Sequence, residues 1–249
     1  MDTKIMLVTG ASRGIGAEIA RLAGRSGWRV GVNYQRSEAA AASVVDEIRA
    51  AGGEAVALQA DVGRSDEVAR MFERLDAEFG ALDVLVNNAG VISNFRVDEV
   101  DEDRLAGILR ANVFSAFFCS REAVRRMSKA HGGRGGVIVN MSSVASRLGG
   151  MSGGAAYAAS KGAIDSFTLA LAKEVGPEGI RVNAMRPGLI ATDIHAVHGG
   201  LEQMERLAKT AVPLGRSGAA AEVAEVALWL ASDAASYVHG AMIDVAGGR

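Results

Sequence analysis

A tyrosine and a lysine stand four residues apart in the second half of the chain, at Tyr157 and Lys161, and two serines precede them at Ser142 and Ser143. Residues four apart share one face of a helix, so the ammonium would lie beside the phenol. A positive charge there favours the phenolate and would lower the tyrosine pKa from about 10 toward working pH. Such a phenol can act as a general acid or base. An exposed Tyr-Lys pair without function has the same spacing, so this pattern alone leaves both interpretations open.

A glycine-rich segment follows the first apolar run of the chain and contains Gly10, Gly14 and Gly16. A helical pattern begins directly after it, over residues 17–23. Glycines at such a turn let backbone amides approach a pyrophosphate at the positive end of a helix dipole. The spacing is GxxxGxG and not the commoner GxGxxG. The segment therefore indicates a phosphate site, with glycines that only close a turn as the alternative.

Short runs rich in valine and isoleucine recur along the chain and are typical of strands buried on both faces. They cover residues 5–8, 29–32, 55–58, 84–86, 137–139, 180–182 and 242–245. Between them lie helical patterns, clearest in the apolar stripe of Val68, Met71, Phe72, Leu75 and Phe79. Alternating strands and helices with right-handed crossovers predict an α/β fold: a doubly wound, mostly parallel sheet of about seven strands with helices on both faces.

Polar and small residues follow the third and fourth predicted strands. Asp61 and Val62 come after the third strand, and the segment 87–90, with sequence NNAG, comes after the fourth. Ligands of such sheets bind at the carboxyl ends of the strands. We therefore expect these residues to gather with the glycine-rich turn around one ligand.

Length and composition narrow the class of protein. With 249 residues, 49% of them apolar, we expect one domain over residues 1–249. Lysine and arginine number 27 against 29 acidic residues, so no nucleic-acid partner is expected. The single cysteine, Cys119, forms no internal disulfide and indicates a reducing, cytoplasmic location. No stretch reaches the ~20 apolar residues that cross a bilayer, so we expect a soluble protein without a membrane partner.

A long segment near the carboxyl end, residues 191–218, includes Gly199, Gly200 and Pro213. Its length suits a mobile flap over a site, with an ordinary surface insertion as the alternative. His195 and His198 within it have the spacing HxxH but lack a third clustered ligand. A metal site needs three or four convergent ligands, so we predict none here.

Six motifs in order carry a family resemblance. They are TGASRGIG from Thr9, NNAG from Asn87, RANVF around Asn112, the serine at Ser143, YAASK from Tyr157 and RPGLIAT from Arg186. Together they closely resemble the classical short-chain dehydrogenase/reductase family, over essentially the whole chain. The resemblance implies a single-domain Rossmann fold and hydride transfer between a nicotinamide and a ketone or secondary alcohol.

The resemblance also implies a role for each matching residue. Tyr157 would donate the proton in reduction and accept it in oxidation. Ser143 would hydrogen-bond the substrate oxygen as charge develops there. Lys161 would lower the tyrosine pKa and hold the nicotinamide ribose, Asn112 would support a water that relays protons to it, and Thr192 would hold the nicotinamide carboxamide.

The end of the second predicted strand bears on which nicotinamide cofactor is used. An NAD-selective site normally has an acidic residue there, but the first one is Glu38, already in the following helix. Arg36 and Ser37 could instead bond a 2′-phosphate, with Arg13 on its other side. We therefore predict NADP(H), with acceptance of NAD as well as the alternative. The residues expected at the cofactor are Gly10, Ser12, Arg13, Gly14, Ile15, Gly16, Asn33, Arg36, Ser37, Asp61, Val62, Asn88, Ala89, Gly90, Tyr157, Lys161, Pro187, Gly188, Ile190 and Thr192.

The substrate is less defined than the cofactor. The gap between Ser143 and Tyr157 is one residue longer than in many family members and holds four glycines, at 149, 150, 153 and 154. This loop would line the substrate pocket. Resemblance elsewhere in the chain favours sugar (glucose) dehydrogenases or 3-oxoacyl-carrier-protein reductases. A non-catalytic cofactor-binding sensor or scaffold is the alternative, although all four residues of the catalytic set are present.

Two surface features concern partners. The resemblance implies a homotetramer in which the helix with Phe114, Phe117 and Phe118 packs against its symmetry mate. The basic stretch around Arg125 and Arg126 could meet an acidic carrier protein or form an ordinary solvated helix end.

Overall fold

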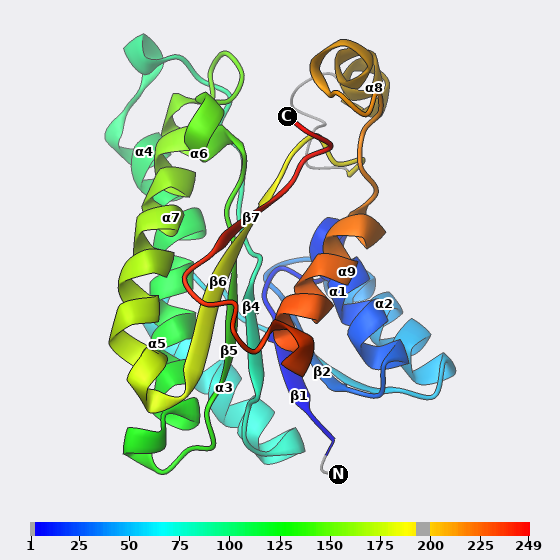
Figure 1. Cartoon of the computed structure of the whole chain (residues 1–249), viewed down its shortest axis with the longest axis vertical. Coiled ribbons are helices and arrows are strands. Elements are labelled where there is room, and N and C mark those ends of the chain that lie inside the picture. The colour runs from blue at the N-terminus through cyan, green and yellow to red at the C-terminus, as the bar shows by residue number, and fades with distance from the viewer. Residues whose placement is uncertain (1–2, 193–199) are drawn as a thin grey trace.

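The computed structural model of the chain describes residues 3–192 and 200–249. Its strands form one sheet in the order β3-β2-β1-β4-β5-β6-β7, and each neighbouring pair is parallel (Figure 1). The strands are β1 (Ile5–Val8), β2 (Arg29–Tyr34), β3 (Glu54–Gln59), β4 (Val84–Asn87), β5 (Gly136–Met141), β6 (Ile180–Pro187) and β7 (Met242–Val245). The predicted doubly wound sheet is confirmed, and every predicted run lies within its strand.

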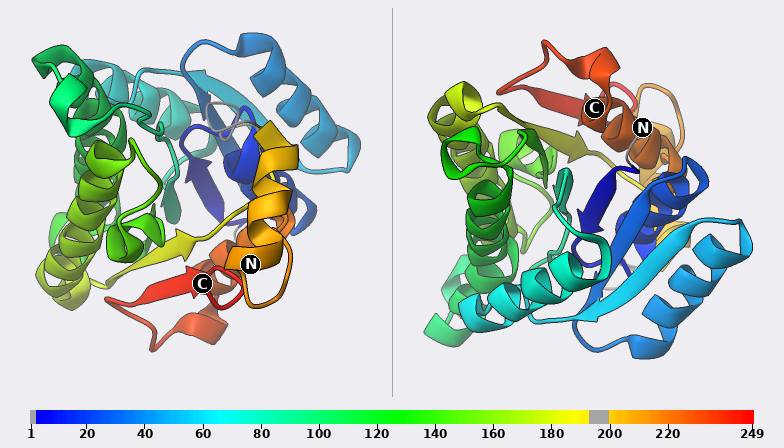
Figure 2. Two further views of the ribbon diagram at one scale, coloured as in Figure 1. Left: turned by 90° about the horizontal axis from the view of Figure 1, so that it is seen from above. Right: turned by 90° about the horizontal axis from the view of Figure 1, so that it is seen from below.

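Helices cover both faces of the sheet (Figures 1 and 2). One face carries α1 (Gly14–Arg25), α2 (Glu38–Ala50) and α9 (Ala220–Ala231), and the other carries α3 (Ser65–Phe79), α5 (Ser115–Met127) and α7 (Ala155–Val175). Nearer the carboxyl ends of the strands lie α4 (Glu102–Leu109), α6 (Ala145–Leu148) and α8 (Gly200–Ala211). Short turns of helix are η1 (Val97–Glu99), η3 (Lys129–His131), η4 (Gly176–Glu178) and η6 (Asp233–Ala235), and η2 (Arg110–Phe114) is a π-helix between α4 and α5.

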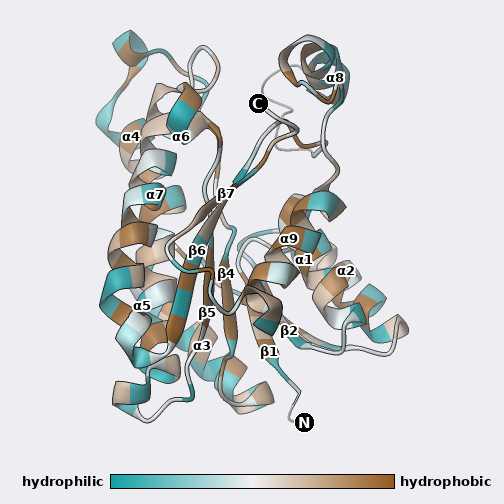
Figure 3. Ribbon diagram, viewed as in Figure 1, coloured by the Kyte–Doolittle hydropathy of each residue, from teal (hydrophilic) through white to brown (hydrophobic). Residues whose placement is uncertain are grey.

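The core consists of two apolar clusters, one on each face of the sheet, and Figure 3 shows the apolar strands between the helices. The predicted stripe of α3 is buried at Val68, Met71, Phe72 and Leu75. Cys119 lies fully buried in the same cluster, and burial raises the pKa of its thiol. The two edge strands differ from the expectation of burial on both faces: β7 is only partly buried along its length, and β3 is exposed at both of its ends.

The segment 191–218 contains a helix, which its glycines did not suggest. Met204 and Ala208 of α8 pack with Val212 and Leu189 in a small third cluster. Residues 193–199, and with them His195 and His198, lie outside the described residues, so the flap and the absence of a metal site stay predictions. None of the helices described here is long and apolar enough to span a membrane.

The basic stretch of α5 is paired with acidic groups. Glu122 is buried and binds Arg121, Arg125 and Arg126, and Arg126 also binds Asp76 at 2.7 Å. These arginines hold the Glu122 pKa below its usual range despite burial of the carboxylate. Two carboxylates thus offset most of the charge of these three arginines within the fold, which favours the solvated helix end over an interface with an acidic carrier.

Candidate active site

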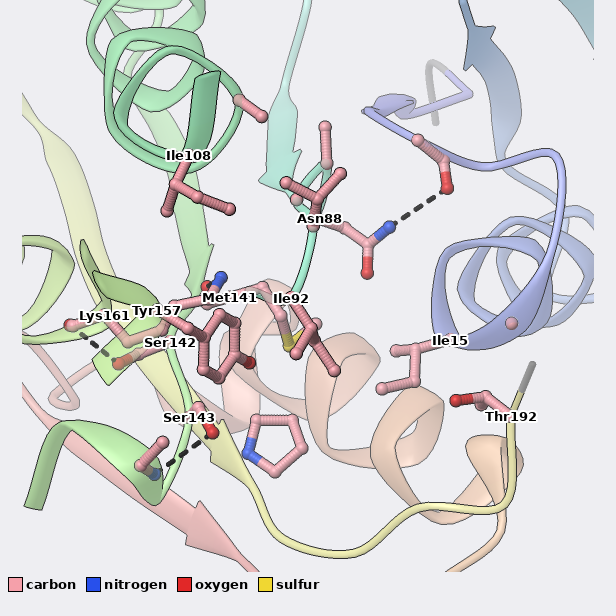
Figure 4. A pocket seen from close by; sticks show the side chains of 18 of the residues that line it. Ile15, Asn88, Ile92, Ile108, Met141, Ser142, Ser143, Tyr157, Lys161 and Thr192 are labelled. Atoms are coloured by element: carbon pink, nitrogen blue, oxygen red, sulfur yellow. Dashed lines mark hydrogen bonds between the residues drawn. The ribbon is translucent and has the colours of Figure 1, made fainter. Parts of the chain in front are cut away.

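The order of strands reverses direction between β1 and β4, and a pocket of about 830 Å³ opens at their carboxyl ends. Ligands of open α/β sheets bind at such a switch point. The pocket is lined by all the residues expected at the cofactor except Gly16, and Ser143 lines it as well. Asn112 lies behind the wall, with 2% of its surface exposed. The structure thus brings the predicted residues together around one space, with Tyr157 and Ser143 across it from Ile15 and Thr192 (Figure 4).

The glycine-rich turn forms a cradle at the start of α1. Gly10 and Gly14 have φ of 62° and 58°, a region that L side chains rarely adopt. A Cβ on Gly10 would lie 2.9 Å from Cα of Ala89. The N-cap residue of α1, Arg13, makes no side-chain cap hydrogen bond, and the first turn of the helix holds no acidic residue. Its free N–H groups and helix dipole therefore suit a phosphate, and the close approach of the chains explains the glycines.

Two asparagines, one buried (Asn33) and one half-buried (Asn88), hold the loops of this cradle. Asn33 Oδ1 accepts from the Gly10 N–H at 3.0 Å, and its Nδ2 donates to the Leu58 and Ala60 carbonyls. Asn88 Nδ2 donates to the carbonyls of Thr9 and Gly10 at 2.9 and 3.1 Å. Both asparagines line the pocket, but these amide bonds go to the protein backbone. Their part at a cofactor is therefore to shape the loops that would surround it.

The far end of the pocket carries two arginines. Arg13 and Arg36 are both exposed and both line it, together with Ser37. Among the described residues, neither guanidinium has a hydrogen-bond or ion-pair partner. The strand end that precedes Arg36 contributes no carboxylate, in contrast to the pattern expected of an NAD-selective site.

The phenol of Tyr157 lies beside the Ser143 hydroxyl, at the carboxyl end of β5 (Figure 4). Lys161 Nζ is 5.7 Å from the centre of the Tyr157 ring and donates to the Met141 carbonyl at 2.7 Å. The expected lowering of the tyrosine pKa is wrong for this structure: burial raises the Tyr157 pKa, and the Ser143 hydrogen bond offsets only part of the rise. The same burial lowers the Lys161 pKa to about 8, against the opposing effect of Asp165. At neutral pH the phenol is therefore protonated and can act as an acid.

Comparison with known proteins agrees with this geometry. Residues 10–249 match the family model described as Enoyl-(Acyl carrier protein) reductase, a model of short-chain dehydrogenases. The chain belongs to the short-chain dehydrogenase/reductase family. It is 48% identical to the oxidoreductase YgfF of Escherichia coli over 98% of this chain and 99% of that protein, and 41% identical to versicolorin reductase stcU of Emericella nidulans over 100% and 96%. A short-chain dehydrogenase of Burkholderia cenocepacia J2315, solved in complex with NADP, matches with a TM-score of 0.88 at 32% identity, over 98% of this chain and 97% of that one.

In this short-chain dehydrogenase/reductase, Asn112 sits in the π-helix η2. Its Oδ1 accepts from the Val91 N–H at 2.7 Å, and its Nδ2 donates to the Val91 carbonyl and to Ser160 Oγ, both at 2.9 Å. A Cβ on Gly90 would lie 3.1 Å from Asn112 Oδ1 and 3.4 Å from Lys161 Nζ. Asn112 thus joins the loop after β4 to helix α7 and lies next to the lysine. π-Bulges of this kind occur frequently at functional sites.

The last segment of the site follows β6. Pro187, Gly188 and Ile190 line the pocket, and Thr192 does so opposite Gly14. A Cβ on Gly188 would lie 2.9 Å from Ala246, so glycine lets this segment pass close to the chain after β7. This placement keeps open the predicted contact of Thr192 with a nicotinamide carboxamide.

Sequence reasoning missed several residues that hold the site. Met141 supplies the carbonyl that binds Lys161. Ser93 and Ser160 bond the main chain of Tyr157. A buried polar chain links β4, β5, α5 and α7: Asn87 binds Ser120 and Asn140, and Asn140 binds Thr168. Asn87 and Ser160 lie in motifs named above, NNAG and YAASK, but without a role assigned to them, and the others had no spacing signal that could have revealed them.

Proposed function

We propose that this protein is an NADPH-dependent reductase of an apolar ketone, with Tyr157 as the proton donor. The observation that carries the proposal is that one continuous pocket holds Arg13 and Arg36, without partners among the described residues, at one end and the Ser143–Tyr157 pair at the other. The first end offers charge for a 2′-phosphate, and the second offers an acid next to a hydrogen-bond donor.

The chain's own residues fit a dinucleotide. The uncapped first turn of α1 and the close-packed Gly10 would receive the pyrophosphate, and the exposed arginines would bond the 2′-phosphate. The NADP complex of the Burkholderia cenocepacia relative supports this choice of cofactor. The nicotinamide would supply the hydride, while Ser143 would hold the carbonyl oxygen and Tyr157 would protonate it as the alcohol forms.

The walls beside Tyr157 favour an apolar substrate over a sugar. Ile92 and Phe95 line the pocket from the loop after β4. Leu148 and Met151 line it from the segment between Ser143 and Tyr157, and Leu189 lines it from the segment after β6. The hydroxyls of a sugar would lose their water against these five side chains and find no partner on them, at a cost of about 1–3 kcal/mol for each unpaired group. A hydrophobic ring or chain would lose nothing of this kind. One relative is named versicolorin reductase stcU, and that name is consistent with a reductive reaction.

Cofactor titration tests the arginines. The double variant Arg13→Ala, Arg36→Ala should weaken NADPH binding by ~2–4 kcal/mol, because two charged hydrogen-bond partners are lost, and should leave NADH binding nearly unchanged. The double variant Arg25→Ala, Arg74→Ala removes the same charge from exposed positions outside the pocket and is the control. Tighter binding of NADH than NADPH by the natural protein would refute the cofactor assignment. Equal losses for both cofactors would show that these arginines do not bind the 2′-phosphate.

Substrate is tested by the fall of NADPH absorbance with a panel of cyclic and aromatic ketones, acyl thioesters and sugars. We expect turnover with apolar ketones at well above the rate with sugars. Preference for a sugar would refute the substrate class, and firm NADPH binding without turnover of any member would favour the sensor or scaffold.

A further inference from the structure

We propose that Ser93 is a positioning residue for the catalytic phenol: from the loop after β4 it supplies the N-cap that helix α7 lacks and so holds the main chain of Tyr157 in place. The proposal rests on the proposed function in that it takes Tyr157 as the acid. It concerns a residue outside the catalytic set, which touches neither substrate nor cofactor in this role.

Helix α7 begins without a cap of its own. Its N-cap residue is Gly154, which has no side chain to accept a hydrogen bond. The first turn of a helix leaves its N–H groups without partners, and a cap side chain normally accepts from the second or third of them. Tyr157 is the third residue of α7, and its N–H donates to Ser93 Oγ at 3.1 Å. Ser93, 64 residues earlier in the chain, therefore accepts the hydrogen bond that an N-cap side chain of α7 would normally accept.

The same hydroxyl fixes the loop that precedes α7. Ser93 Oγ donates to the Gly153 carbonyl at 3.2 Å, and the Phe95 N–H donates to that carbonyl at 3.2 Å. Gly153 has φ of 79°, and a Cβ there would lie 3.2 Å from the Phe95 nitrogen. Ser93 is 2% exposed, so water has little access to replace its bonds. The two loops that form the apolar walls beside Tyr157 are thereby joined to each other and to the catalytic helix.

These bonds are part of a closed circuit around Tyr157. The Tyr157 carbonyl accepts from Ser160 Oγ at 2.7 Å, and Ser160 Oγ accepts from Asn112 Nδ2. Asn112 holds both the N–H and the carbonyl of Val91, two residues before Ser93. Tyr157 is thus held by its N–H on one side and its carbonyl on the other, from a loop that is itself fixed.

These hydrogen bonds affect the chemistry because Ser93 holds the main chain of Tyr157, and the side chain of Tyr157 is the phenol that would donate the proton. Opening of the first turn of α7 would move the phenol from the Ser143 hydroxyl beside it. A misplacement of about 1 Å can lower a rate by about a hundredfold. Most of the residues expected at the cofactor lie outside this turn, on the glycine-rich loop, on α1 and after the strands, and Tyr157 is the one member of the turn among them, so binding should change little.

Amide hydrogen exchange in solution tests the cap without any substrate. In Ser93→Ala, exchange of the Tyr157 amide should be at least about tenfold faster than in the natural protein. Ser93→Thr keeps the hydroxyl and should restore the protection. The matched control is Ser128→Ala: Ser128 is fully buried, and its Oγ caps η3 by accepting from the Ala130 N–H at 3.1 Å, far from the pocket. It should leave the Tyr157 amide protected.

Kinetics then test the positioning role on the ketone that the substrate panel identifies. Ser93→Ala should lower kcat by about ten- to a hundredfold while the Kd of NADPH stays within about twofold, and Ser128→Ala should keep the natural kcat. Unchanged exchange of the Tyr157 amide in Ser93→Ala overturns the proposal, whatever the panel shows. Faster exchange with an unchanged kcat overturns the positioning role. If Ser93→Thr does not fold, the comparison of the two alanine variants still decides. An inactive natural protein would count against the proposed function alone, since the exchange result stands apart from turnover.

Discussion

Replacement of Lys161 by methionine should make the protein more stable and inactive at once. Lys161 is 4% exposed, and burial lowers its pKa from 10.5 to about 8. At 1.36 kcal/mol per pH unit, this means that the fold disfavours the ammonium by about 3 kcal/mol relative to the unfolded chain at neutral pH. Methionine has a similar length and no charge to bury.

One favourable contact would be lost in the variant. Lys161 Nζ donates to the Met141 carbonyl at 2.7 Å, and the loss of one hydrogen bond costs about 1 kcal/mol. The net expectation at pH 7 is a gain of about 2 kcal/mol in the free energy of unfolding of Lys161→Met. The gain should be full below pH 8 and should shrink as the pH rises toward 10.5, because the natural protein regains stability once its lysine is neutral.

Urea unfolding at pH 7 and pH 9.5, at one protein concentration, measures this difference. Lys173→Met is the control, since Lys173 is an exposed lysine on the same helix, and it should change stability little at either pH. A Lys161→Met variant that is no more stable than the natural protein at pH 7, or whose gain is the same at both pH values, would refute the reasoning.

Two further substitutions test the site. Tyr157→Phe keeps the ring but removes the acid, so turnover should fall about 100- to 10,000-fold. NADPH binding, followed by fluorescence titration, should stay nearly intact. A variant that keeps more than about a tenth of the natural activity would exclude Tyr157 as the acid. Gly16→Ala would place a Cβ against Asn88 Nδ2 and 2.7 Å from the Gly10 carbonyl, so it should displace the Asn88 amide and weaken NADPH binding by about tenfold or more. Gly162→Ala lies in α7, where a Cβ would meet no described group within 4 Å apart from its chain neighbours and its own helix backbone, so it should leave binding unchanged. Equal effects of the two alanines would show that the cradle is not tightly packed.

The fold was predictable from the sequence because apolar periodicity records burial directly. The seven runs lie within the seven strands, and the stripe of α3 is buried as its spacing requires. The edge position of β7 was not predictable, because the order of strands in a sheet depends on how the strands pair and not on the residues of any single strand. The helix α8 was missed where glycines suggested only a loop.

The site was predictable where backbone geometry demands a residue type, and less so where electrostatics decide. Gly10 and Gly14 have positive φ, so the turn required glycine. The direction of the Tyr157 pKa was wrong, because spacing on a helix places the charge of Lys161 nearby but does not reveal how deeply both groups are buried. Ser93 could not be found, because its partner Tyr157 is 64 residues away and no local pattern joins them.

The π-helix η2 limits which insertions and deletions the chain can accept. An α-helix turns by about 100° per residue, and the wide turn over Arg110–Phe114 accommodates an additional residue between α4 and α5. Deletion of one residue here would let α4 and α5 merge into a regular helix and would rotate α4, with Ile108 of the pocket wall, by roughly that angle relative to α5. It would also remove Asn112 from the place where it meets Val91 and Ser160. For these five residues the length of the segment matters as much as its chemistry, so we expect substitutions to be tolerated here at several positions and a single-residue deletion at none.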